Sequence, residues 1–179
     1  MYKSLRKSAG FNALELMMVL AVISIAIVGV VKTMSSNSDK QNSNQMITDV
    51  NAMVANIKNA YSGTNNGYAD LSTQAAIDMK AVPQGLKING ETIKNQFQGG
   101  TVTIEPANNG DAFDITYTNV PQAVCASSVN TLGSSAFLSI QVNGDEVLNT
   151  ATQKALSATK VAQDCASQQE KSTIIFTAS

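Results

Sequence analysis

Residues 11–34 read FNALELMMVLAVISIAIVGVVKTM and are apolar almost throughout. The exceptions in this stretch are Asn12, Glu15, Ser24, Lys32 and Thr33. A helix over these residues would be about 36 Å long at 1.5 Å per residue. That length is enough to cross a hydrocarbon core of roughly 30 Å. The stretch therefore predicts a membrane-spanning helix near the start of the chain.

The residues before this stretch indicate its orientation. Lys3, Arg6 and Lys7 lie there, with no acidic residue among the first ten. The positive-inside rule then places the N-terminus in the cytoplasm and the rest of the chain outside the membrane. A secretory signal peptide would have a shorter apolar core, of about 7–15 residues, followed by a small-residue cleavage site. No such site follows at residues 32–34, so a simple single-pass anchor is the plainer alternative.

Glu15 is the unusual residue in the apolar stretch. A carboxylate inside a membrane span costs at least a few kcal/mol unless it is paired, which makes it a candidate for function. It is the fifth residue counted from Phe11, which itself follows Gly10. Residues 10–16, GFNALEL, resemble the processing site of type IV prepilins. The resemblance implies a leader of residues 1–10, cleavage by a prepilin peptidase between Gly10 and Phe11, and N-methylation of Phe11.

The same resemblance implies a role for Glu15 in assembly, as partner of the Phe11 amine of a neighbouring subunit. Either charge left unpaired in a filament core of packed helices would be costly. Pairing the two between subunits removes both penalties at once. Such a pair could also set the axial register of an incoming subunit.

The helical pattern continues beyond the apolar stretch. Apolar residues recur at steps of three and four, which places them on one helix face: Met46, Val50, Met53, Val54, Ile57 and Tyr61. The opposite face is expected to hold Asp49, Asn51, Asn56 and Lys58. We predict one helix from about Asn12 to Tyr61, with an amphipathic half over residues 35–62. Its segment 35–45 has low helix propensity and could bend.

The remaining chain, residues 63–179, reads as a globular head of short strands and helices. Asn89-Gly90 and Asn143-Gly144 are hairpin signals, and Asp145-Glu146 beside the second reads as a solvated loop. Strands are expected at residues 86–88, 92–93, 101–105, 113–117, 137–142, 147–148 and 172–177, and helices at 71–79, 122–131 and 152–165. The predicted fold class is α+β, with the long helix packed on an antiparallel sheet.

Two segments of the head strengthen the resemblance. Residues 113–125, FDITYTNVPQAVC, and 161–165, VAQDC, resemble the two cysteine regions of type IVb pilins. That group includes the toxin-coregulated pilin and the thin-pilus pilins of conjugative plasmids. The likeness is weak over residues 65–108. A ten-residue leader and Phe11 as first mature residue are commoner in the type IVa group.

Cys125 and Cys165 are the only cysteines. An exported domain with two cysteines is expected to join them in a disulfide. That bond would close a loop of about 40 residues and stabilise the head by roughly 3–4 kcal/mol in the loop-entropy model. The alternative is a pair of unpaired, buried thiols.

The composition argues against an enzyme or a metal protein. The chain has no histidine, so the commonest general base and metal ligand are missing. Two cysteines are too few for a thiolate zinc site. Residues 109–111 and 143–145 lack the spaced oxygen ligands of a calcium loop. A net charge of −1 does not suggest a nucleic-acid surface. We expect no catalytic residue, cofactor or metal.

These observations predict a structural subunit, the major one, of a type IV pilus serving adhesion, aggregation or conjugation. Its expected partners are copies of itself, the prepilin peptidase, the inner-membrane assembly machinery and, before assembly, membrane lipid. The precursor would sit in the bacterial inner membrane with a periplasmic head, and the assembled pilus outside the cell. The alternatives are a minor pilin, a type II secretion pseudopilin or a monomeric membrane-anchored binding protein. The last predicts no cleavage at Gly10 and tolerance of changes at Glu15.

Overall fold

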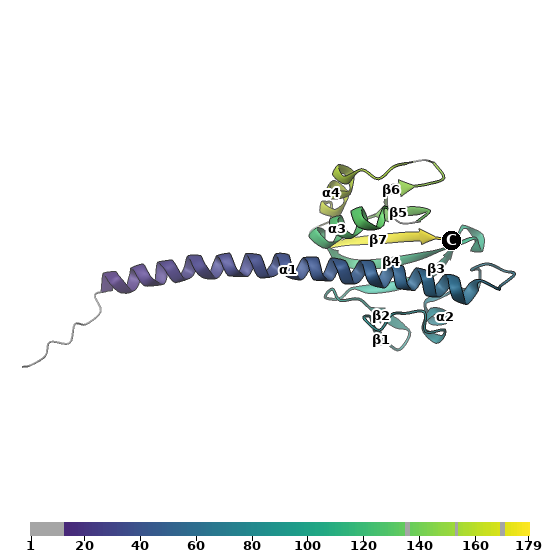
Figure 1. Ribbon diagram of the computed structural model, residues 1–179, viewed down its shortest axis with the longest axis horizontal. Helices are drawn as coiled ribbons and strands as arrows, with labels where there is room; N and C mark the ends of the chain where they lie inside the picture. The colour runs from purple at the N-terminus through teal and green to yellow at the C-terminus, as the bar shows by residue number, and fades with distance from the viewer. Residues whose placement is uncertain (1–12, 135–136, 153, 169–170) are drawn as a thin grey trace, which may run out of the picture. The chain divides into compact units, whose positions relative to one another are not determined.

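The computed structural model describes residues 13–134, 137–152, 154–168 and 171–179, with side chains from Asn37 onward. The chain divides into two compact units, Met1–Ser38 and Asp39–Ser179. Helix α1, Ala13–Tyr61, is the long helix expected from the sequence, and it ends at the predicted residue (Figure 1). Within the part of the chain whose side chains are described, no helix is both long and apolar enough to cross a membrane. The side chains of the predicted span, residues 11–34, lie outside that part.

The second unit contains a seven-stranded antiparallel sheet. The spatial order is β1-β2-β3-β4-β7-β5-β6. The strands are β1 Lys87–Asn89, β2 Thr92–Lys94, β3 Thr101–Ala107, β4 Ala112–Pro121, β5 Ser139–Val142, β6 Asp145–Asn149 and β7 Lys171–Ala178. The strand latest in the sequence, β7, therefore lies inside the sheet, between β4 and β5 (Figure 1).

The part of α1 after Ser38 covers one face of this sheet. The predicted apolar stripe is buried there, with Met46, Val50, Met53 and Ile57 at 0% exposure. These side chains belong to the same core as the inward-facing residues of the strands. Met46 and Met53 of the stripe are thus part of the core. The α+β architecture expected from the sequence is thus the observed one.

The short helices occur where the sequence predicts them, with one difference in length. They are α2 Thr73–Asp78, α3 Gln122–Leu132 and α4 Ala158–Ala166; the 3-10 turn η1, Asn108–Gly110, was not predicted. The prediction started the last helix at Thr152, which is wrong. Asn149 and Lys154 exchange two backbone hydrogen bonds, so the chain before α4 forms a turn closed by a β-bridge instead of a helix. Ser157 then caps the helix by accepting a hydrogen bond from the backbone N–H of Lys160.

Both predicted hairpins form, but their turns differ in detail. In the β5–β6 hairpin the two turn residues are Asn143 and Gly144, with φ of 54° and 88°. Positive φ at both positions is the geometry that favours Asn-Gly. Because this turn is only two residues long, Asp145 and Glu146 begin β6, and the expected solvated loop is wrong. In the β1–β2 hairpin Asn89 pairs with Thr92, which leaves the next two residues as the turn.

Candidate functional site

The structure describes some of the predicted site residues and not others. Gly10 and Phe11, the predicted cleavage and methylation residues, lie outside the described residues. Glu15 lies in α1, but its side chain is outside the description. The two cysteines are fully described, and the structure brings them together. The described part of the candidate site therefore consists of the two cysteines and the contact of α1 with the head.

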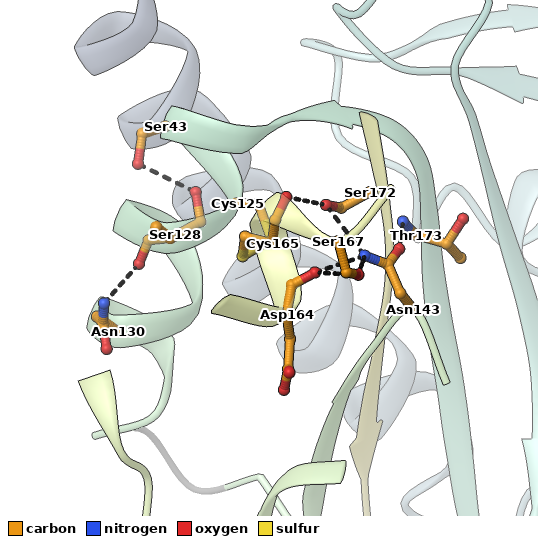
Figure 2. Close-up of a disulfide and its surroundings, with 11 residues drawn as sticks. Ser43, Cys125, Ser128, Asn130, Asn143, Asp164, Cys165, Ser167, Ser172 and Thr173 are labelled. Atoms are coloured by element: carbon orange, nitrogen blue, oxygen red, sulfur yellow. Dashed lines mark hydrogen bonds between the residues drawn. A yellow bond between two sulfur atoms is a disulfide. The ribbon is translucent and has the colours of Figure 1, made fainter. Parts of the chain in front are cut away.

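Cys125 and Cys165 form a disulfide, as the sequence predicted (Figure 2). Their Cα atoms lie 5.9 Å apart, within the usual range for a disulfide. Both residues are fully buried. Cys125 lies in α3 and Cys165 in α4, so the bond ties these two helices to each other. The alternative of two free buried thiols is excluded by this geometry.

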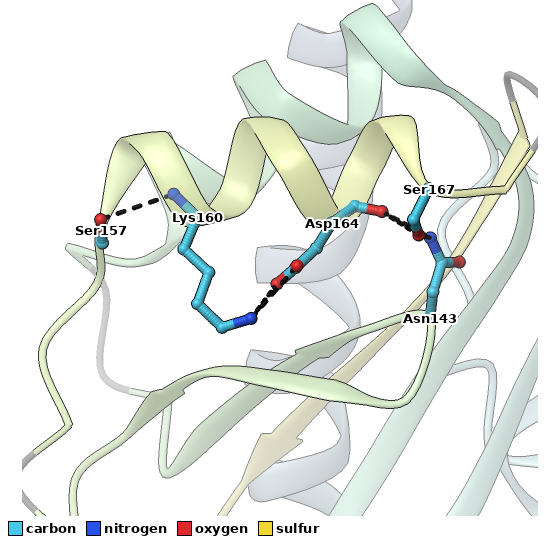
Figure 3. Close-up of polar contacts among 5 residues, drawn as sticks. All are labelled: Asn143, Ser157, Lys160, Asp164 and Ser167. Atoms are coloured by element: carbon cyan, nitrogen blue, oxygen red, sulfur yellow. Dashed lines mark hydrogen bonds and ion pairs between the residues drawn. The ribbon is translucent and has the colours of Figure 1, made fainter.

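Asn143 fixes the end of α4 to the sheet. Its Nδ2 donates to the backbone oxygen of Asp164, at 2.8 Å, and to Oγ of Ser167, at 3.2 Å (Figures 2 and 3). Its Oδ1 accepts from the backbone N–H of Thr173 in β7, at 2.9 Å. The sequence identified Asn143 only as a turn residue. Its position in an Asn-Gly turn places the amide there, but its partners come from segments more than 20 residues away.

Helix α4, which contains Cys165, has an ion pair between Lys160 and Asp164. Lys160 Nζ lies 2.8 Å from Asp164 Oδ2, one helical turn away (Figure 3). The hydrogen bond to Asp164 raises the pKa of Lys160. Because the ammonium is exposed, this ion pair contributes little to stability. It holds the Asp164 side chain, while the backbone oxygen of the same residue accepts from Asn143.

A cluster of hydroxyl groups connects α1 to the helix that contains Cys125. Oγ of Ser43 donates to Oγ of Ser127 at 3.1 Å. It also lies 3.0 Å from Oγ of Ser128 (Figure 2). Ser43 is 2% exposed and Ser128 is fully buried. Buried hydroxyls are costly when they lack partners, and these satisfy one another. The disulfide helices are thereby attached to α1 as well as to the sheet.

Asp49 is buried, although the sequence placed it on the polar face of α1. It is only 1% exposed, because the turn that contains Gly85 covers it. A Cβ at residue 85 would lie 2.7 Å from Nε2 of Gln45 and 3.0 Å from Oδ1 of Asp49. A side chain at residue 85 would have to displace the Gln45 amide and would crowd Asp49. The apolar periodicity could not show this, because the covering residue lies 36 positions further along the chain.

The buried carboxylate has few partners. Gln45 donates to its Oδ1 at 2.8 Å, while among the described residues Oδ2 has no hydrogen-bond partner. Burial raises the pKa of Asp49. The hydroxyl of Tyr117 in β4 is also buried without a partner in the described part of the chain. Burial, and secondarily the charge of Asp49, raise the pKa of Tyr117.

Asp49→Asn removes the buried charge and is expected to stabilise the head at neutral pH by about 1 kcal/mol, at the lower end of the cost of a buried polar or charged group without a full set of partners. An aspartate whose folded-state pKa is raised stabilises the fold fully below its unfolded pKa, and this contribution is lost as pH rises through the folded pKa. The advantage of the variant should therefore be present at pH 7 and shrink on acidification towards about pH 4. Thermal unfolding of the full chain in detergent at both pH values measures it, with an expected shift of roughly 2–4 °C at pH 7.

Asp78→Asn is the matched control for this prediction. Asp78 also accepts from a glutamine one turn earlier, Gln74, at 2.7 Å, but it is exposed. Its replacement should leave the melting temperature nearly unchanged at both pH values. An Asp49→Asn variant that gains nothing at pH 7, or gains equally at both pH values, would contradict the burial argument.

Comparison with known proteins identifies the family. The family model described as PilS N terminal matches residues 40–179. The "Major structural subunit of bundle-forming pilus" of Escherichia coli O127:H6 is 32% identical over 131 residues, covering 71% of this chain and 67% of that protein. The protein of the same name from Escherichia coli O111:H- gives the same values.

Two solved structures share the fold. The crystal structure of TcpA, a type IV pilin from Vibrio cholerae El Tor, matches with a TM-score of 0.58 and 21% identity, covering 78% of this chain and 99% of that one. The NMR structure of the type IVb pilin PilS from Salmonella typhi matches with a TM-score of 0.50 and 19% identity, covering 76% and 95%. Together with the family match over residues 40–179 and the relative at 32% identity, the fold leads to one conclusion: the chain belongs to the PilS family of type IVb pilins.

Proposed function

We propose that the chain is a prepilin that is cut after Gly10, held in the bacterial inner membrane and polymerised into an extracellular type IV pilus. One observation supports this most strongly. Gly10, Phe11 and Glu15 have the spacing of a prepilin site at the start of an apolar stretch. That stretch continues into helix α1, which leads into a head with the pilin fold. The family and fold are those of structural pilins.

In this proposal each part of the chain has its own task. Residues 1–10 are the leader that the prepilin peptidase removes. Residues 11–34 anchor the precursor in the membrane and then form the filament core, and residues 35–62 are the amphipathic half of the helix. Residues 63–179 form the head. The inner-membrane assembly machinery would pass the subunit from lipid to filament. Because the Escherichia coli relatives are major structural subunits by name, we propose the same rank for this chain.

Protein from sheared surface filaments should begin at Phe11 and be methylated on its amine. Gly10→Val should leave an unprocessed precursor in the inner membrane, because the residue before the cut can no longer enter a site shaped for glycine. N-terminal mass spectrometry of surface and membrane fractions measures both. Ser4→Val, the same kind of change away from the cut, should be processed normally. Intact Met1 in assembled material would overturn the proposal in favour of a simple anchor.

A further inference from the structure

The face of the sheet turned away from the core has a polar row that runs across five neighbouring strands. The register pairs residues in this order: Glu105, Asp114, Thr177, Ser139 and Asn149. Side chains alternate between the two faces of a strand, and the neighbours of Asp114 in β4 are buried in the core. The row therefore belongs to the opposite face, from β3 to β6.

Hydrogen bonds fix the side chains at the centre of this row. Ser139 Oγ donates to Thr177 Oγ1 at 3.0 Å, and Thr177 Oγ1 donates to Asp114 Oδ1 at 2.6 Å. Thr177 is only 7% exposed, so a buried hydroxyl orients the carboxylate. In β6, Asn149 Nδ2 donates to Glu146 Oε1 in the same way. Each carboxylate thus has one oxygen held by an internal donor. For the other oxygen the described residues supply no donor.

A hollow of about 340 Å³ lies over this part of the sheet, within the size range of small-molecule sites. Ala107 and Asn108, from the β3–η1 segment, line one side, and Thr150 and Ala151 line the other. Leu138 adds an apolar surface. The described residues that line it include two carboxylates and neither lysine nor arginine.

We propose that this hollow binds a neutral sugar. The outward oxygens of Asp114 and Glu146 are acceptors for vicinal hydroxyl groups, and charge-assisted hydrogen bonds of this kind are among the stronger ones. The amides of Asn108 and Gln141, also in the lining, can donate and accept. Two uncompensated carboxylates disfavour an anionic ligand. A metal ion is disfavoured because no cluster of three ligating acids, histidines or cysteines occurs among the described residues.

The affinity of one site should be weak, since no aromatic ring lines the hollow. In a filament the same site would recur on every subunit, and many weak sites together bind a glycan-coated surface avidly. That gain in avidity rests on the proposed function. The site in a single head does not.

The test is a titration of the isotope-labelled full chain in detergent micelles, followed by amide NMR. The probes are methyl α-mannopyranoside, methyl β-galactopyranoside and N-acetylglucosamine. At least one should give saturable shifts at residues 107–114, 138–151 and 177. Asp114→Asn and Glu146→Gln keep the oxygen that Thr177 or Asn149 contacts, and each should weaken binding by about tenfold, in line with a lost charge-assisted hydrogen bond.

Glu105→Gln is the matched control. Glu105 lies in the same row and pairs with Asp114, but it does not line the hollow. Its replacement should leave sugar binding unchanged. The proposal is overturned if none of the three sugars gives saturable shifts, if Glu105→Gln weakens binding as much as Asp114→Asn, or if calcium chloride alone produces the shifts. Because the readout is made on unassembled protein, its failure would leave the filament proposal standing, and a failure to assemble would leave this one standing.

Discussion

Replacing Glu15 by alanine is expected to abolish surface filaments while the head stays folded and disulfide-bonded. Before assembly this carboxylate would sit near the cytoplasmic boundary of the membrane, where water and lipid headgroups still reach it. In the filament core that access is lost, and the Phe11 amine of a neighbour becomes its partner. Leaving one half of a buried ion pair unmatched typically costs about 3–5 kcal/mol, which is enough to stall polymerisation.

Three measurements separate this result from a general defect. Electron microscopy of sheared material counts filaments, N-terminal mass spectrometry of the membrane fraction reports cleavage after Gly10, and thiol labelling reports the disulfide. Glu15→Gln keeps the size of the side chain and should fail as Glu15→Ala does. Ser24→Ala, which removes another polar group from the same stretch, should assemble normally. Normal filament yield from Glu15→Ala would remove the role proposed for this residue.

Loss of the disulfide is expected to have a comparable effect through stability. Cys125→Ser or Cys165→Ser should destabilise the head by roughly 3–4 kcal/mol. Small domains are stable by only about 5–15 kcal/mol in total, so much of the protein should be lost to degradation. Helix α4 would still be held by Asn143 through the backbone oxygen of Asp164, but its covalent link to α3 would be gone.

Denaturant unfolding and thiol labelling test this prediction. The double variant with both cysteines replaced should be no less stable than either single variant. Either single replacement already removes the disulfide, so the second removes no further bond. Ser128→Ala, which removes only a buried hydroxyl next to Ser43, should cost about 1 kcal/mol. Native protein should resist thiol labelling until a reductant is added. Efficient labelling without reductant would show that the bond does not form in the folded protein.

Local sequence signals predicted most of the helices and strands. The apolar steps of three and four along α1, and the Asn-Gly pairs, depend on neighbours within a few residues, so they could be recognised without the fold. The pairing of Cys125 with Cys165 needed only the count of cysteines and an exported domain. The start of α4 was misjudged, because the bridge between Asn149 and Lys154 competes with a helix that composition alone permits.

The features that escaped prediction depend on distant parts of the chain. Burial of Asp49 depends on Gly85, and the hydrogen bonds of the Asn143 side chain depend on partners in α4 and β7. The polar row from Glu105 to Asn149 exists only because β7 enters between β4 and β5. Periodicity indicates which residues of one strand share a face, but not which strand lies beside it. The candidate sugar site therefore had no signal in the sequence.

The central place of β7 also governs when the head can be completed during biogenesis. This strand pairs with β4 on one side and β5 on the other, so without it β1–β4 and β5–β6 are two separate pieces. A nascent chain that has emerged only as far as α4 holds both cysteines but leaves the facing edges of β4 and β5 unpaired. Such edges invite aggregation and proteolysis. Only chains synthesised through β7 can therefore form the continuous seven-stranded sheet.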